Sequence, residues 1–312
     1  MKSLNIRLLA AVAVMLPTMA NAFPDGPVTL IVPYNPGGSS DVVTRVLAEG
    51  LERQLGSTVV VKNVAGAGGA LGWREARDAD PDGHTYALWV DSLAVMEVTK
   101  AADLKSSDYA AGCQFGEVPL TIFANAKKGP KSLAELKELS DARPGAVGIG
   151  MGYGTPAQFA AALARNELTD TLQLVNIGGG ANKKAAVLGG HVASAVEPVP
   201  GVRAQHQGGE LNIIAVLSDE RLDGLDAPTA REQGVDLTVS LSYGLIAPKD
   251  TPSEAIEAVC GAVAGLADDA EFQDRLAGID VTWRYGASGD WAERLSEITS
   301  ETAEVGRALG FE

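Results

Sequence analysis

The chain has 312 residues, with 25 basic and 40 acidic side chains and a net charge of −15 at pH 7. This acidic balance argues against nucleic acid and anionic membrane surfaces as partners, because both repel a negatively charged protein. The only two cysteines, Cys113 and Cys260, exclude a disulfide-rich scaffold, and their spacing fits no metal motif.

The first 22 residues are predicted to be a secretory signal peptide. Lys2 and Arg7 form a basic start, residues 8–16 form an apolar stretch too short to span a membrane, and Ala20-Asn21-Ala22 fits a cleavage site. We therefore expect an exported protein of residues 23–312, in which 23 basic residues stand against 40 acidic ones. Export permits a Cys113–Cys260 bridge, and two separate buried thiols are the alternative.

Short apolar runs alternate with helical patterns along the whole chain. Strands are predicted at residues 28–32, 59–61, 86–90, 120–123, 147–149, 172–175, 193–196, 213–216 and 243–246. Helices are predicted after the first strand, over residues 156–165 with Thr155 as cap, and over residues 252–266. Such alternation predicts an α/β fold in which helices cover parallel sheets.

The helix after the first strand has the clearest pattern. It can be capped by Ser39, Ser40 or Asp41. Its apolar residues recur at three- and four-residue spacing: Val42, Val43, Val46, Leu47, Leu51 and Leu55.

Two crossovers are predicted where breaker residues follow the strands at 120–123 and 243–246. They would place residues 23–121 and 244–312 in a first domain that combines both ends of the chain. Residues 122–243 would then form an inserted second domain.

Two glycine-rich loops directly follow the strands at 28–32 and 59–61. A glycine loop that opens a helix exposes backbone N–H groups at the positive end of the helix dipole, which makes an anion site without side-chain charge. We expect the two loops to hold carboxylates. The candidate ligand-binding residues in them are Tyr34, Asn35, Gly37, Gly38, Ser39, Ser40, Asp41, Ala65, Gly66, Ala67 and Gly68.

Further segments at strand ends are candidate pocket walls, although glycine there also has the simpler role of allowing turns with positive φ. These candidates are Asp91, Ser92, Tyr153, Gly154, Thr155, Gly178, Gly179, Gly180, Ala181 and Glu197.

Five side chains near these loops have two possible roles each. Tyr34 and Tyr153 would cover the ligand or pack partly into the core. Glu197 would accept a ligand amine or hydroxyl, or lie solvated. Lys183 and Lys184 would assist an anion or lie at the surface.

Catalytic motifs are scarce. The three histidines His84, His191 and His206 are scattered without metal-site spacing. Residues 152–157 match a loose dinucleotide fingerprint, but the next strand ends in Asn176 instead of the acid that binds a ribose. A secreted nucleotide-dependent enzyme is therefore the weaker alternative, and we predict no enzymatic activity, no metal and no cofactor.

Seven pieces of the chain, in order, carry a family resemblance. They are IVPYNPGGSSD (31–41), AGAGG (65–69), PDGHT (81–85), GTP (154–156), LGGHV (188–192), APT with EQG (227–234), and YGLIAP with TP (243–252). Together they resemble the extracytoplasmic solute-binding proteins of tripartite tricarboxylate transporters, the Bug family.

The resemblance implies a two-domain periplasmic-binding-protein fold, of the type II-like Venus-flytrap kind, with the ligand cleft between the domains. It implies a periplasmic monomer that captures a small carboxylate, such as a di- or tricarboxylate, an aromatic acid or an acidic amino acid, for membrane permease subunits. Loops 35–41 and 65–69 would grip the carboxylate through backbone amides, and loops 153–155 and 178–181 would contact its far end. A ligand sensor for a signalling partner is the alternative.

This chain departs from the family pattern at several of these positions. Ser40 replaces the usual threonine, and Gln158 stands where a histidine is common. Residues 178–180 are three glycines, and Glu197 lies near a frequent aspartate. These departures concern the part of the pocket that would meet the far end of the ligand.

Overall fold

The computed structural model describes residues 23–308 and 310, so the predicted signal peptide lies outside the described residues. The strands are β1 Val28–Val32, β2 Val59–Asn63, β3 Thr85–Trp89, β4 Tyr109–Asn125, β5 Gly148–Met151, β6 Gln173–Asn176, β7 Ser194–Pro198, β8 Leu211–Val216, β9 Ser240–Pro248 and β10 Thr282–Gly286. The α-helices are α1 Ser39–Leu55, α2 Ala70–Arg77, α3 Ser92–Val98, α4 Leu133–Ala142, α5 Pro156–Leu168, α6 Gly180–Gly189, α7 Arg203–Gln207, α8 Ser253–Ala264, α9 Ala270–Ala277 and α10 Ser288–Ala308. Every helix in this part of the chain is too short or too polar to cross a membrane.

The strands form one mixed sheet in the order β2-β1-β3-β9-β4-β7-β5-β6, with β8 and β10 also paired to β4. The predicted parallel pairing is confirmed at both ends, where β1 pairs with β2 and β3, and β5 pairs with β6 and β7. The prediction is wrong for the middle, where β4 runs antiparallel to β7, β8, β9 and β10. The chain thus runs along the middle of the sheet once in each direction, first in β4 and later in the antiparallel β9.

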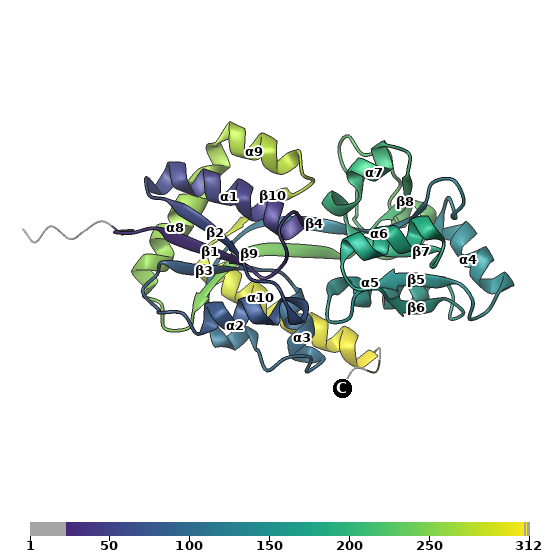
Figure 1. Cartoon of the computed structure of the whole chain (residues 1–312), viewed down its shortest axis with the longest axis horizontal. Coiled ribbons are helices and arrows are strands. Elements are labelled where there is room, and N and C mark those ends of the chain that lie inside the picture. Colours follow the sequence, from purple (N-terminus) through teal and green to yellow (C-terminus); the bar gives the residue numbers. More distant parts are fainter. Residues whose placement is uncertain (1–22, 309, 311–312) are drawn as a thin grey trace, which may run out of the picture.

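Figure 1 shows two lobes, with β4 and β9 running between them. Up to Pro119, β4 pairs with β9, and from Leu120 onward it pairs with β7 and β8. The chain thus enters the second lobe within one long strand, of which the sequence predicted only residues 120–123. The domain boundaries at 121/122 and 243/244 remain a prediction.

The first lobe is built around α1 and three tryptophans. Four of the predicted apolar positions of α1 are buried, namely Val43, Val46, Leu47 and Leu51, whereas Val42 is exposed. Trp73, Trp89 and Trp291 are fully buried, and the rings of Trp89 and Trp291 meet edge to face at 6.2 Å. Since Trp291 belongs to α10, the C-terminal helix completes the core of the N-terminal strands.

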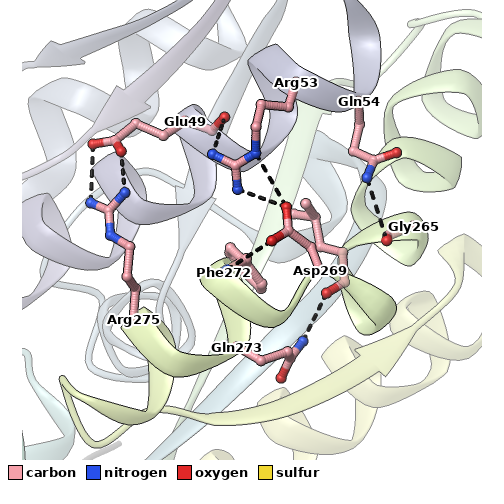
Figure 2. Close-up of polar contacts among 9 residues, drawn as sticks. Glu49, Arg53, Gln54, Gly265, Asp269, Phe272, Gln273 and Arg275 are labelled. Atoms are coloured by element: carbon pink, nitrogen blue, oxygen red, sulfur yellow. Dashed lines mark hydrogen bonds and ion pairs between the residues drawn. The ribbon is translucent and has the colours of Figure 1, made fainter.

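Polar contacts also fasten the C-terminal segment to α1 (Figure 2). Arg53 on α1 lies 2.7 Å from Asp269, and Arg275 on α9 pairs with Glu49. Asp269 also caps α9 by accepting the Phe272 N–H at 3.0 Å. Exposed ion pairs contribute little stability, about 1 kcal/mol or less each. They nevertheless fix the orientation of α1, whose first turn belongs to the candidate site.

Cys113 on β4 and Cys260 on α8 are both buried and free. Of the two alternatives, the structure therefore shows thiols, not a bridge. Burial and the neighbouring Cys260 raise the pKa of the Cys113 thiol, which keeps it protonated and unreactive at neutral pH.

Candidate functional site

The predicted site residues lie in loops at the carboxyl ends of parallel strands, three strands in each lobe. Loops after β1, β2 and β3 belong to the first lobe, and loops after β5, β6 and β7 belong to the second. Met96 on α3 connects the two sets. A methyl group on Gly68 would come within 2.7 Å of Met96 Cε, and one on Gly154 would come within 3.8 Å of Met96 Cγ. The structure thus brings the loops of the two lobes together around one buried side chain.

The loop between β1 and α1 is held by Asp41. The Gly37 N–H donates to Asp41 Oδ2 at 2.8 Å, and Arg45 pairs with Asp41 at 2.9 Å. Asn63, the last residue of β2, donates to Asp41 Oδ1 at 2.9 Å and to the Tyr34 carbonyl at 3.1 Å. Hydrogen bonds from Arg45, Gly37 and Asn63 hold the pKa of Asp41 below its ordinary value despite burial. Asp41 is therefore a buried carboxylate that shapes the loop.

The first turn of α1 has unpaired donors. Its N-cap is Gly38, without a side-chain cap, so the predicted capping by Ser39, Ser40 or Asp41 is wrong. Asp41 instead bonds to Gly37, which precedes the helix. Within the described chain, no acceptor pairs with the N–H groups of Gly38, Ser39 and Ser40. A 17-residue helix thus directs its positive end and three free donors out of the loop.

The second loop, residues 65–69, lies against the first. A Cβ on Gly72 of α2 would come within 2.7 Å of Pro33 Cα, so only glycine allows this approach. Gly66 and Gly68 have φ values of +142° and +70°, which disfavour other residues. No acceptor in the described chain pairs with the N–H groups of Ala67 and Gly68. Two sets of free amides thus lie on neighbouring strand ends.

Tyr34, Asp91 and Ser92 lie beneath these loops. Burial raises the pKa of the Tyr34 phenol, and the nearby Ser92 side chain partly opposes this rise. Asp91 accepts from Trp89 Nε1 at 3.1 Å and from the Ser242 N–H at 3.2 Å. Burial outweighs these bonds and raises the pKa of Asp91 from 3.8 to about 7. Asp91 therefore joins β3 to the crossing strand β9 and titrates near neutrality.

The loop between β5 and α5 has few free donors. The Tyr153 N–H donates to Asn176 Oδ1 at 3.2 Å, and the Gly154 N–H donates to Gln158 Oε1 at 2.8 Å. The Thr155 hydroxyl donates to the Gly152 carbonyl at 2.8 Å. The Tyr153 side chain itself is exposed. This loop therefore offers a ligand the exposed Tyr153 ring, whereas its Tyr153 and Gly154 amides are already paired.

The loop before α6 again has unpaired amides. In the described residues the N–H groups of Gly179, Gly180 and Ala181 have no acceptor. Glu197, at the end of β7, lies directly over Gly180, where any Cβ would overlap its carboxylate. Lys183, expected to assist an anion or lie at the surface, is instead buried and paired with Glu197.

Comparisons with known proteins identify the family of this chain. Residues 43–310 match the model of the tripartite tricarboxylate transporter family receptor. The chain belongs to this family. BugT of Bordetella pertussis is 33% identical over 255 residues, which cover 80% of this chain and 78% of BugT.

Solved structures of periplasmic binding proteins share the receptor fold. BugD has a TM-score of 0.83 at 26% identity, covering 93% of this chain and 99% of BugD. MatC of Rhodopseudomonas palustris, solved with bound malate, has a TM-score of 0.81 at 24% identity, covering 91% of this chain and 99% of MatC. The predicted family and two-lobed α/β class are thereby confirmed.

Four further residues of this receptor organise the loops, although the sequence singled out only Gln158, as a departure in the far part of the pocket, and Lys183, as a possible helper of an anion. Asn63 and Gln158 supply side-chain partners for loop amides and carbonyls, Met96 lies between the lobes, and Lys183 is the buried partner of Glu197. The sequence could have indicated Asn63, because it is a polar residue at the end of an apolar strand, next to a glycine loop. The other three lie on helices, where the pattern gives no sign of which loop they reach.

Proposed function

We propose that this protein is a periplasmic solute-binding protein that captures a small carboxylate between its lobes and delivers it to membrane permease subunits. The observation that carries the proposal is the set of free N–H groups at Gly38, Ser39 and Ser40, beside those at Ala67 and Gly68. Amides at a helix start bind a carboxylate through directed hydrogen bonds and the helix dipole.

A cradle of amides suits a strongly acidic protein. A carboxylate ligand gains no long-range attraction from a surface with a net charge of −15. Short-range N–H donors act only on contact, so they bind the anion without requiring a basic surface. Closure of the second lobe would then exclude water from these hydrogen bonds and strengthen them.

The relatives support the same class of ligand. The family is named for the receptor of a tripartite tricarboxylate transporter, and MatC was solved with malate, a dicarboxylate. From these relatives we carry over to this protein only two properties: a carboxylate as ligand and membrane permease subunits as partners. Together with the predicted signal peptide, they favour export to the periplasm. The amino terminus of the secreted protein should then be Phe23, which sequencing by mass spectrometry would check.

A thermal-shift screen of residues 23–312 tests the proposal. The panel contains mono-, di- and tricarboxylates, aromatic acids and amino acids, beside the matching amides as uncharged controls. A ligand at a hundred times its dissociation constant adds about 2.7 kcal/mol, which raises the melting temperature by roughly 4–5 °C in a protein of this size. We expect acids and not their amides to shift it. Mass spectrometry of denatured protein first confirms an empty site, and an empty protein that no acid stabilises would refute the proposal.

A further inference from the structure

The second lobe carries an internal ion pair that involves Lys183, one of the two lysines expected to assist an anion or lie at the surface. Lys183 on α6 donates to the Val196 carbonyl at 2.7 Å and pairs with the Glu197 carboxylate. The Lys183 side chain is 5% exposed and that of Glu197 is 14% exposed. The cation is thus engaged inside the protein, whereas part of the carboxylate remains accessible.

The Glu197 carboxylate lies at the start of α6. It touches Gly180, the first residue of the helix, where a side chain would overlap it. It therefore occupies the position in which the free amides of the helix start would attract a negative charge. Lys184, which follows Lys183 in α6, donates instead to the Gly201 carbonyl at 2.8 Å.

Acidic groups also gather beside the crossing strands. Burial raises the pKa of the Tyr243 phenol on β9, and the charges of Glu197, Tyr34 and Asp91 raise it further. The two carboxylates come from different lobes, Asp91 from the end of β3 and Glu197 from the end of β7. A ligand held by the first-lobe amides would therefore extend toward phenols and carboxylates.

We infer that the ligand is a monocarboxylate with a hydrogen-bond donor, an ammonium or a hydroxyl, at its far end, and that Glu197 accepts that donor. The inference rests on the proposed carboxylate-binding function. Glu197 keeps acceptor capacity beyond its bond to Lys183, because a carboxylate has about four acceptor positions. A second ligand carboxylate would instead meet a fixed negative charge at the helix start, and such like-charge contact opposes binding.

Matched five-carbon acids test this inference by isothermal titration calorimetry. The acids are pentanoate, 5-hydroxypentanoate, 5-aminopentanoate and glutarate, with four- and six-carbon versions to cover the span. We expect the hydroxy and amino acids to bind wild type roughly tenfold or more tightly than the dicarboxylate of equal length, as expected for one unfavourable charge contact.

Three variants assign the preference to the ion pair. Glu197→Gln leaves the Lys183 charge unpaired and should reverse the preference toward the dicarboxylate. Lys183→Met with Glu197→Gln removes both charges at similar volume and should abolish the preference in either direction. Lys184→Met is the matched control, which should leave the order of affinities unchanged. Thermal melts of each variant confirm that it is folded.

The outcomes separate the two proposals. Dicarboxylates that bind wild type as tightly as the hydroxy and amino acids would overturn the inference and leave carboxylate capture intact. The inference would also fail if Glu197→Gln kept the wild-type order. Absence of binding by every acid would overturn both this inference and the proposed function.

Discussion

The two lobes use the same local pattern, a glycine loop that opens a helix, with different results. In the first lobe the N–H groups of Ser39 and Ser40 have no acceptor among the residues that the structure describes, because Asp41 bonds to Gly37 instead of capping the helix. In the second lobe the N–H groups of Tyr153 and Gly154 are taken by Asn176 and Gln158. The availability of a loop amide is therefore decided by neighbouring side chains and not by the glycines themselves.

The largest expected effect comes from placing a charge in the first-lobe cradle. Gly38 has an ordinary φ of −84°, and a Cβ there would meet only the Asn35 carbonyl at 3.6 Å. Gly38→Asp should therefore fold but repel the ligand carboxylate by about 4 kcal/mol, close to a thousandfold in affinity. Calorimetric titration with the best acid from the screen measures this. Gly38→Asn, of equal size and no charge, should bind far better, and equal losses in both variants would contradict the electrostatic argument.

The pH dependence of stability separates two first-lobe carboxylates. The raised pKa of Asp91, about 7 against 3.8, means that its contribution is fully present below about pH 4 and is lost as the pH rises toward 7. The loss should be about 4 kcal/mol, since each pKa unit corresponds to about 1.4 kcal/mol. The pKa of Asp41 is lowered, so its contribution is present above pH 3.8 and lost only at lower pH.

Urea unfolding between pH 4.5 and 8 checks this difference. Asp91→Asn should flatten the decline in unfolding free energy, whatever its absolute stability, since it removes the titrating group. Asp41→Asn should leave the slope over this range unchanged. A wild-type slope that Asp91→Asn does not alter would show that another group is responsible.

Removing the carboxylate that shapes the first loop should affect both stability and binding. Asp41→Ala leaves the Gly37 N–H without its acceptor and removes one of the two acceptors of the Asn63 amide, at a cost of about 2 kcal/mol. The loop then loses its fixed shape, and carboxylate affinity should fall about tenfold, since 1.4 kcal/mol corresponds to a factor of ten. Urea unfolding and calorimetry measure the two effects. Unchanged affinity in a destabilised Asp41→Ala protein would mean that the loop shape does not govern binding.

The corresponding change in the second lobe should have the smallest effect on binding. Gln158→Ala removes the buried acceptor of the Gly154 N–H and should cost about 1–2 kcal/mol of stability. Because this amide is not among the free donors, affinity for a simple monocarboxylate such as pentanoate should change less than threefold. Gln158→Glu, which keeps an acceptor, is the matched control for stability. A large loss of affinity in Gln158→Ala would place the carboxylate grip in both lobes.

Much of the architecture was predictable because local pattern and tertiary structure agree. The alternation of short apolar runs and helical stripes predicted the parallel strands at both ends of the sheet. The apolar spacing of α1 predicted a buried face that includes Val43 and Leu47. The glycine loops were predictable because positive φ at Gly66 and Gly68 requires glycine.

The length of β4 was not predictable. Gln114 and Gly116 interrupt the apolar pattern of this segment, yet both are buried because β9 and β10 pair with this half of the strand. Such pairing joins segments more than a hundred residues apart, so no local signal marks it. Lys183 similarly looks like a surface residue until Glu197 and the Val196 carbonyl supply its partners.

The sequence by itself determined the family, the order of strands and helices, and the loops that face each other, because periodicity and glycine act over a few residues. Only the tertiary structure decided which amides are free. Asp41 bonds back to Gly37, Gln158 reaches Gly154, and Glu197 covers the start of α6. Each of these contacts depends on the direction of a side chain within the folded chain, and this is where hydrogen-bond donors are either satisfied or left for a ligand.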